Sequence, residues 1–176
     1  DRHTVLMLSS LKTYKGTHIF IRLASLMPQF RFVLVINDTS EAITAWIESK
    51  DIKIPDNITI HPRSSDVARF YNQASLVVNL SDPDLVIETF GLTALEAMSC
   101  ALPVIVPIKG GIAEMVTDNI NGFKIDCKNT QQLSKTISAL LSDRENYERI
   151  ANNALTYSRS YSRDAMIGRI CNVLEK

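Results

Sequence analysis

The chain has 176 residues, of which 45% are hydrophobic, and its 19 basic and 19 acidic residues give zero formal net charge. This length is sufficient for one hydrophobic core, and a neutral chain has no global field that would attract nucleic acid or an anionic membrane. No apolar run approaches the length of about 18 residues that a membrane span needs. The three cysteines are far apart and form no C-x-x-C motif, so we expect packed small side chains in a reducing, cytoplasmic environment.

Short apolar runs alternate with amphipathic segments along most of the chain. The predicted strands are Val5–Leu8, Phe32–Ile36, Ile58–His61, Leu76–Leu80, Val104–Val106 and Phe123–Ile125. The predicted helices are Thr17–Met27, Glu41–Lys50, Asp66–Gln73, Leu92–Ser99, Ile112–Val116 and Gln131–Leu141. This alternation predicts an α/β fold, a doubly wound Rossmann-like parallel sheet with helices on both faces.

The end of the chain departs from this alternation. Arg144–Ser158 and Ser162–Glu175 are successive helical patterns with no strand between them, and Ser160–Ser162 offers a break and an N-cap. We therefore predict a single domain over residues 1–176 in which residues 144–176 form terminal helices.

Two glutamates flank a predicted turn from strand to helix. The segment Val86–Val116 reads V-I-E-T-F-G-L-T-A-L-E-A-M-S-C-A-L-P-V-I-V-P-I-K-G-G-I-A-E-M-V, which places Glu88 in the turn and Glu96 in the helix. Such a turn lies at the carboxyl end of a strand, and open α/β sheets bind ligands at that edge. A helix start there offers N–H groups and a positive dipole end to a phosphate. Carboxylates accept hydrogen bonds from sugar hydroxyls. The pair therefore suits a nucleotide sugar, although both glutamates could also merely solvate a surface helix.

This stretch resembles the E-x7-E signature and the following P-V…G-G-x-x-E block of retaining GT-B glycosyltransferases, group 1 (family 4) class. The matching residues are Glu88, Phe90, Gly91, Leu92, Glu96, Ala97, Met98, Pro103, Val104, Gly110, Gly111, Glu114, Val116, Asn121, Gly122 and Phe123. The resemblance implies that Glu88 is catalytic and holds the hexose, and that Glu96 binds the ribose. It implies further donor contacts near the diphosphate and the sugar, namely Phe90, Gly91, Leu92, Gly110, Gly111 and Glu114.

The resemblance also bears on domain organisation, because enzymes of this class have two such domains. The chain begins at Asp1 without an initiator methionine, and we expect an excised carboxyl-terminal, donor-binding domain whose amino-terminal acceptor domain is absent. In this class the last helix typically crosses back to the other domain, whereas an ordinary terminal helix packs on its own sheet. The sequence leaves both possibilities open.

A second anion site is predicted between the first strand and the first helix. The segment Ser9–Gly16, S-S-L-K-T-Y-K-G, resembles the family's G-R-x-x-x-x-K-G segment, whose arginine and lysine neutralise the donor diphosphate. The match implies a catalytic role for Lys15. Serine stands at position 10 in place of arginine, and a hydroxyl cannot bridge two phosphate oxygens as a guanidinium does. Either Lys12 replaces the arginine, or Lys12 is solvated and the diphosphate binds more weakly.

Two further segments follow predicted strands. His61–Arg63 ends the third strand, where members of the family tend to hold the base, so Pro62 and Arg63 are candidate donor contacts. Asp82–Asp84 has the D-x-D form of a metal site in a different glycosyltransferase fold, but we expect a turn there. We expect no metal and no other cofactor.

The resemblance implies that the whole enzyme transfers a hexosyl unit from a nucleotide diphosphate sugar to a hydroxyl acceptor with retention, in polysaccharide or glycolipid biosynthesis. The expected partners are the nucleotide sugar and a saccharide or lipid-linked acceptor held by the missing domain, and no nucleic acid. Peripheral association of the full-length enzyme with the inner face of the membrane is compatible with this role. A GT-B-fold nucleotide-sugar epimerase and a non-catalytic sugar-nucleotide-binding module are the alternatives.

Overall fold

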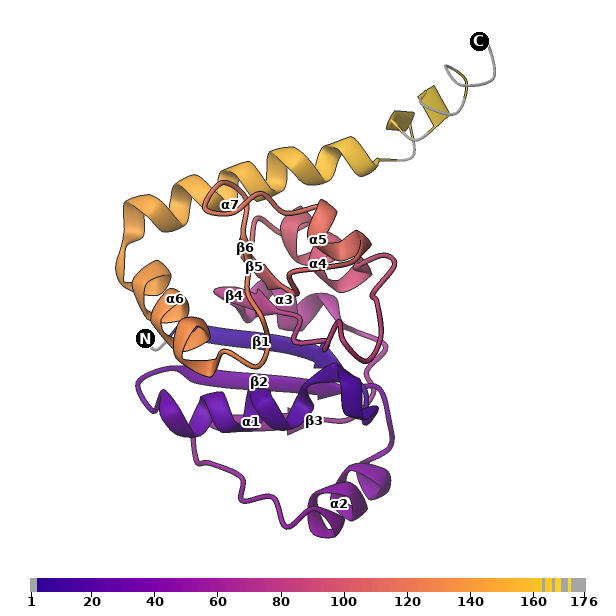
Figure 1. Cartoon of the computed structure of the whole chain (residues 1–176), viewed down its shortest axis with the longest axis vertical. Helices are drawn as coiled ribbons and strands as arrows, with labels where there is room; N and C mark the ends of the chain where they lie inside the picture. Colours follow the sequence, from indigo (N-terminus) through magenta and orange to yellow (C-terminus); the bar gives the residue numbers. More distant parts are fainter. Residues whose placement is uncertain (1–2, 163, 166, 169–170, 172–176) are drawn as a thin grey trace.

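Six parallel strands form one sheet in the order β3-β2-β1-β4-β5-β6 (Figure 1). The structure, a computed structural model, describes residues 3–162, 164–165, 167–168 and 171. The strands are β1 Thr4–Ser9, β2 Arg31–Ile36, β3 Ile58–His61, β4 Leu76–Val78, β5 Val104–Val106 and β6 Phe123–Lys124. The predicted doubly wound parallel sheet is confirmed. Strand β4 is two residues shorter than predicted, because the side chain of Asn79 accepts a hydrogen bond from the Ser81 N–H and turns the chain.

Nine helical segments connect or follow these strands within residues 3–162. They are η1 Thr13–Lys15, α1 Thr17–Leu26, α2 Ser40–Ser49, α3 Ala68–Gln73, α4 Leu92–Ser99, α5 Gly111–Glu114, α6 Thr130–Ser142, α7 Arg144–Ser158 and η2 Arg159–Tyr161. Asn129 and Asp143 each accept a hydrogen bond from a first-turn N–H, which fixes where α6 and α7 begin. The final helix predicted over 162–175 falls largely on residues outside those described. None of the described helices combines the length and hydropathy needed to cross a bilayer.

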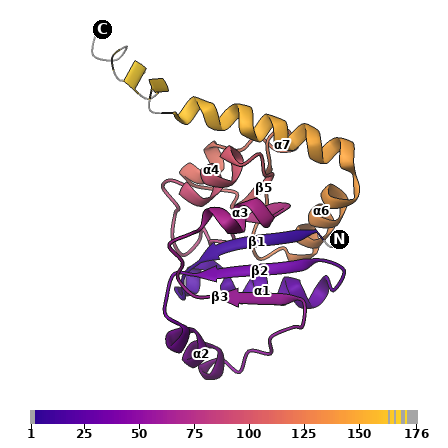
Figure 2. The same cartoon turned by 180° about the vertical axis from the view of Figure 1, so that it is seen from behind.

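Helices cover both faces of the sheet, and alternate strand residues feed two separate cores (Figures 1 and 2). Val5 and Met7 of β1 pack toward α1 and α6, whereas Leu6, between them, packs toward α3 and α4. Helix α7 contributes Ile150 to the first core and Ala154 to the second. This alternation is the period of two expected of a strand that is buried on both faces.

The cysteines differ from the sequence-based expectation. Cys127 is buried, as expected of a packed small side chain, but Cys100 and Cys171 are exposed. The expectation was wrong for Cys100 because it follows the last turn of α4, where the side chain faces away from the sheet's core. All three thiols are free.

The strand order reverses between β1 and β4, so the chain leaves these neighbouring strands in opposite directions. The loops that follow them therefore diverge at the carboxyl edge of the sheet, which is the usual ligand site of such folds. Gly16, with φ 69°, brings the first loop against the second, because a Cβ atom there would overlap the carbonyl group of Leu80. A side chain at position 16 would thus push the two loops apart.

Candidate functional site

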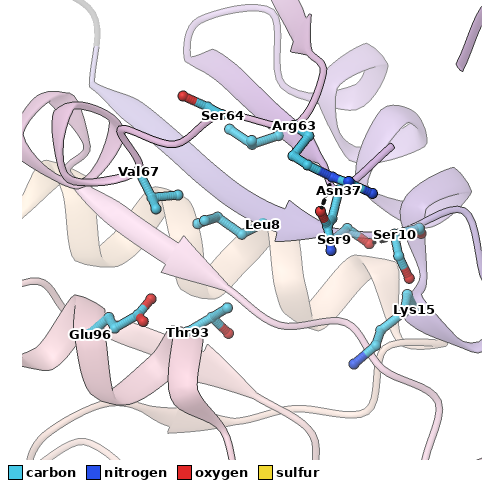
Figure 3. A pocket seen from close by; sticks show the side chains of 11 residues that line it. Leu8, Ser9, Ser10, Lys15, Asn37, Arg63, Ser64, Val67, Thr93 and Glu96 are labelled. Carbon is cyan, nitrogen blue, oxygen red and sulfur yellow. Dashed lines mark hydrogen bonds between the residues drawn. The ribbon is translucent and has the colours of Figure 1, made fainter. Parts of the chain in front are cut away.

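A cavity of about 410 Å³ lies where these two loops diverge (Figure 3). This volume falls within the range of about 300–1,000 Å³ that is typical of small-molecule sites. The lining residues come from the ends of the first three strands, from η1, from the approach to α3 and from α4. They are Leu8, Ser9, Ser10, Lys15, Val35, Asn37, Arg63, Ser64, Val67, Thr93 and Glu96.

The cavity is apolar in its middle and polar at its ends. Figure 3 shows Glu96 at one end and Lys15 at the other, with Leu8 between them. Arg63 lies on the wall opposite Lys15, beyond Ser10. An elongated ligand with an anionic part, an apolar face and hydroxyl groups matches this order of side chains.

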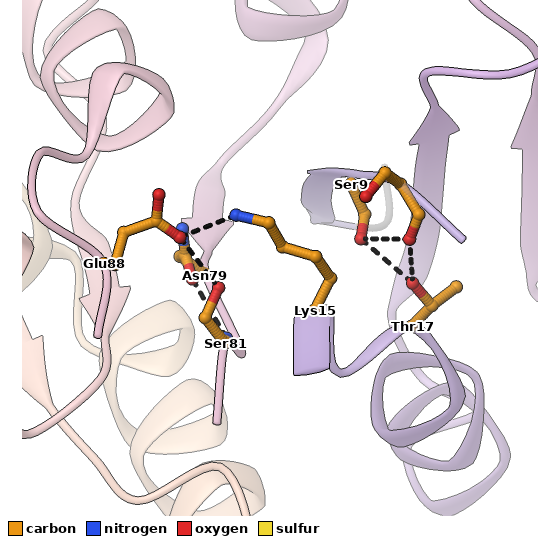
Figure 4. A network of polar contacts seen from close by, with 7 residues as sticks. Ser9, Lys15, Thr17, Asn79, Ser81 and Glu88 are labelled. Carbon is orange, nitrogen blue, oxygen red and sulfur yellow. Dashed lines mark hydrogen bonds and ion pairs between the residues drawn. The ribbon is translucent and has the colours of Figure 1, made fainter. Parts of the chain in front are cut away.

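Lys15 and Glu88 form an ion pair that links the two diverging loops (Figure 4). Lys15 Nζ lies 2.6 Å from Glu88 Oε2, and Ser81 Oγ donates to the same oxygen at 3.1 Å. The two charged side chains are 24% and 22% exposed. The predicted catalytic pair is thus brought together directly. Glu88 itself does not line the cavity and reaches it through Lys15.

Glu96 is held by a residue that the sequence analysis did not identify. The buried Tyr71 of α3 donates its hydroxyl to Glu96 Oε2 at 2.6 Å. Burial raises the pKa of Tyr71, and the hydrogen bond to Glu96 raises it further, so the hydroxyl remains a donor at physiological pH. The sequence contains only a weak indication of this contact. A tyrosine on the buried face of a helix needs a hydrogen-bond partner for its hydroxyl, but the sequence does not identify that partner.

The segment after β3 places Arg63 in the cavity. Arg63 Nε donates to Asn37 Oδ1 at 2.7 Å, and the backbone N–H of Arg63 donates to the Asp38 carbonyl at 2.9 Å. His61 packs on Phe70 with ring centroids 5.0 Å apart, and burial lowers the pKa of His61. Pro62, in contrast, is not among the lining residues.

The start of α4 is open to solvent. Phe90 is 44% and Leu92 is 61% exposed, and no side chain caps the helix at Gly91. Neither Phe90 nor Leu92 lines the cavity. The Phe90 ring contacts that of Tyr161 at 6.1 Å. The uncapped N–H groups at this helix start can bind an anion, and Thr93 of the same turn lines the cavity.

Gly110 and Gly111 support the loop that carries Glu88. A Cβ atom on Gly110 would lie 2.6 Å from the Glu88 carbonyl oxygen, and one on Gly111 would overlap the Thr89 carbonyl oxygen. These glycines therefore permit close approach to the chain's own backbone. Glu114, which ends α5, is exposed and does not line the cavity.

Lys12 lies outside the cavity. It lines a separate depression of about 300 Å³ together with Trp46 and Lys50, and its Nζ atom lies 5.9 Å from the centroid of the Tyr14 ring. Lys15 Nζ also lies near this ring, 5.4 Å from its centroid, but of the two lysines only Lys15 lines the cavity, together with Arg63.

The Asp82–Asp84 segment forms a turn, as expected. Asp82 Oδ1 accepts the N–H of Asp84 at 3.0 Å, and Lys128 Nζ lies 3.1 Å from Asp82 and 2.7 Å from Asp84. The hydrogen bond from Lys128 lowers the pKa of Asp84. Both carboxylates are thus engaged by a lysine. Within the part of the chain that the structure describes, no group of three or more potential metal-binding side chains gathers.

Comparison with known proteins finds a matching family and relatives of similar sequence. Residues 1–156 match the family described as Glycosyl transferases group 1. The D-inositol 3-phosphate glycosyltransferase of Xylanimonas cellulosilytica is 26% identical over 179 residues, which cover 98% of this chain but only 42% of that protein. The chain therefore spans less than half the length of this relative.

Solved structures show the same fold. The C-terminal domain of the group 1 family protein LpcC from Francisella tularensis has a TM-score of 0.71 at 23% identity, covering 90% of this chain and 85% of that one. HepE from Anabaena, solved in complex with UDP and glucose, has a TM-score of 0.79 at 25% identity, covering 99% of this chain and 48% of that one.

Proposed function

The chain belongs to group 1 of the glycosyl transferases, and we propose that it binds the nucleotide diphosphate sugar from which a hexosyl unit is transferred, with retention, to a hydroxyl acceptor. One observation carries the proposal: a single cavity at the switch point of the sheet has Lys15, which is paired with Glu88 behind it, at one end and Glu96 at the other. The likeness to HepE, a protein solved with UDP and glucose, supports a nucleotide sugar as the ligand.

The charges suit the proposed reaction. When the bond between the sugar and the diphosphate breaks, negative charge grows on the leaving phosphate and positive charge on the sugar. In our proposal Lys15 and the N–H groups at the start of α4 stabilise the phosphate, while Glu88 holds the sugar hydroxyls and offsets the positive charge. Glu96 accepts hydrogen bonds from the ribose. The acceptor oxygen then bonds to the sugar, and its proton passes to the leaving phosphate.

The ion pair gives this proposal a defined first step. Lys15 Nζ is paired with Glu88, so an arriving diphosphate must share or replace the carboxylate as the partner of the ammonium group. Glu88 is then released toward the sugar, which arrives with the same ligand. Binding of the donor and preparation of the carboxylate are therefore a single event in this scheme.

We further propose that the acceptor, a saccharide or a lipid-linked sugar, is bound by a separate amino-terminal domain and that the whole enzyme works in the cytoplasm, in polysaccharide or glycolipid biosynthesis. The share of the relative's length that this chain spans supports a second domain. We also propose that the reaction needs no metal, because cationic side chains face the proposed diphosphate position.

Binding to the chain itself tests the proposal. The panel consists of hexoses linked to UDP, GDP or ADP. We expect the hexoses that carry one of these three bases to raise the melting temperature of the chain, in proportion to the logarithm of ligand concentration. Matched nucleoside monophosphates should stabilise less. If no nucleotide sugar in the panel binds at millimolar concentration, the proposal is wrong. Product analysis with the full-length protein then distinguishes transfer from epimerisation and from binding without turnover.

A further inference from the structure

The cavity contains two cationic side chains, and their electrostatic states differ. Lys15 is paired with Glu88 at 2.6 Å, so a carboxylate already compensates its charge. Arg63 makes one side-chain hydrogen bond, from Nε to the neutral amide oxygen of Asn37 at 2.7 Å. Among the described residues, no carboxylate lies within ion-pair distance of the Arg63 guanidinium. Arg63 is therefore the uncompensated positive charge of the cavity.

Two hydrogen bonds hold the exposed Arg63, one through its backbone and one through its side chain. Its backbone N–H is held by the Asp38 carbonyl at 2.9 Å, and its Nε by Asn37. Its two terminal NH₂ groups make no hydrogen bond or ion pair with a described residue. A guanidinium that is anchored through Nε and free at both terminal nitrogens can donate two parallel hydrogen bonds to one phosphate.

The loop that carries Lys15 supplies no second cation to the cavity. Ser10 lines the cavity between Arg63 and Lys15 (Figure 3), and its carbonyl oxygen accepts hydrogen bonds from Thr17 and Ser9. Lys12, two residues further along, faces the separate depression beside Trp46. Neither residue of this loop supplies the second positive charge that a diphosphate favours.

We propose that Arg63 binds the diphosphate of the donor and supplies, from the end of β3, the guanidinium that is absent at position 10. This inference rests on the proposed function and refines it, since it gives Arg63 the phosphate rather than the base. The phosphate group would lie between Arg63 and Lys15. The nucleoside would extend over Leu8 and Val67 toward Glu96, along the apolar part of the cavity.

Calorimetry with this chain tests the assignment. The probes are UDP, GDP and ADP, followed by the nucleoside that corresponds to the tightest binder, measured by competition. We expect Arg63→Ala to weaken the nucleoside diphosphate about tenfold or more, as for the loss of one charge-assisted contact, and to leave the nucleoside unchanged. Arg22→Ala, which removes an exposed arginine of α1 away from the cavity, is the control with matched charge and should change neither affinity.

A charge-relocation variant makes the test specific. We expect Ser10→Arg to restore most of the diphosphate affinity in the Arg63→Ala background, because it places a guanidinium on the facing wall of the same cavity. Lys12→Ala should leave diphosphate affinity intact.

Three results would overturn the inference. Equal losses for the nucleoside and its diphosphate in Arg63→Ala would assign Arg63 to the base. A large loss in Lys12→Ala with none in Arg63→Ala would assign the role to Lys12. In both cases the proposed function stands, because the unaltered chain still binds a nucleotide. Failure of the unaltered chain to bind any of the three diphosphates would remove the proposed function together with this inference.

Discussion

Tyr71 and Glu96 are joined by a 2.6 Å hydrogen bond between α3 and α4, beside the cavity. The hydroxyl of Tyr71 approaches the carbonyl oxygen of Thr93 as well, at 3.4 Å. Because Glu96 Oε2 is engaged in this way, the carboxylate is fixed in orientation, and Oε1 has no donor among the described residues. A buried tyrosine thus determines which oxygen of Glu96 is available to a ligand.

Replacing Tyr71 by phenylalanine should remove the hydrogen bond to Glu96 without creating a cavity in the core. We expect weaker binding of the ribonucleoside diphosphate and a reduced preference for it over the 2′,3′-dideoxy analogue, because the carboxylate no longer faces the ribose in one orientation. Calorimetry with both nucleotides measures the preference. A variant that loses affinity for both nucleotides equally would show that Tyr71 serves only the packing of α3.

Removing the charge of Glu88 should free Lys15. We expect Glu88→Gln to bind the nucleoside diphosphate a few-fold more tightly than the unaltered chain, because the ammonium group no longer has a competing carboxylate. The gain should shrink as salt is added. The same substitution should abolish transfer in the full-length enzyme. Retained transfer at near-normal rate would contradict the role proposed for Glu88.

The glycine pair should be intolerant of even one methyl group. Gly111→Ala places a Cβ atom on the Thr89 carbonyl oxygen, and we expect a loss of about 1–3 kcal/mol in the free energy of unfolding, typical of overpacking. Urea denaturation measures it. Gly168→Ala is the matched control, because a Cβ atom there meets nothing within 4 Å. Equal effects of the two substitutions would rule out the contact with Thr89 as the cause.

The three thiols should differ from one another in their reactivity toward an alkylating reagent. Burial, followed by the charges of Asp82 and Asp126, raises the pKa of Cys127 to about 11. At pH 8 we therefore expect iodoacetamide to label the exposed Cys100 and Cys171 in the folded chain, and to label Cys127 only after unfolding. Peptide mass analysis gives the site occupancies. The unfolded state loses the thiol proton first, near pH 9, so the contribution of Cys127 to stability should decline between about pH 9 and 11.

Much of the fold was predictable because apolar periodicity is a local property of the sequence. All six strands and all helices predicted before residue 160 occur within about two residues of the expected bounds. The exception in strand length, at Asn79, arises from a side chain that bonds to its own backbone turn, and a pattern of apolar residues contains no information on that bond.

The site was predictable only in part, because it depends on which loops meet. The resemblance named Lys15, Glu88 and Glu96; the structure places Lys15 and Glu96 at opposite ends of one cavity, with Glu88 paired to Lys15, and the roles of the three stay predictions. The sequence did not indicate that Lys15 and Glu88 pair with each other across 73 residues, or that Tyr71 holds Glu96. The sequence also could not decide whether Lys12 replaces the arginine that is missing at position 10. Only the fold shows that Ser10 lines the cavity, whereas Lys12 lines a separate depression.

The fit of Gly110 and Gly111 against the backbone of Glu88 and Thr89 has a practical consequence for redesign. The two segments are separate in the sequence but packed backbone to backbone, so an insertion or a bulkier residue at the glycines would displace Glu88. The neighbouring side chains of Leu85, Val86 and Ile87 are exposed. Of these three, Ile87 lies beside Gly110, 3.3 Å from a Cβ atom placed there, so a redesign can vary Leu85 and Val86 and should leave the glycines unchanged.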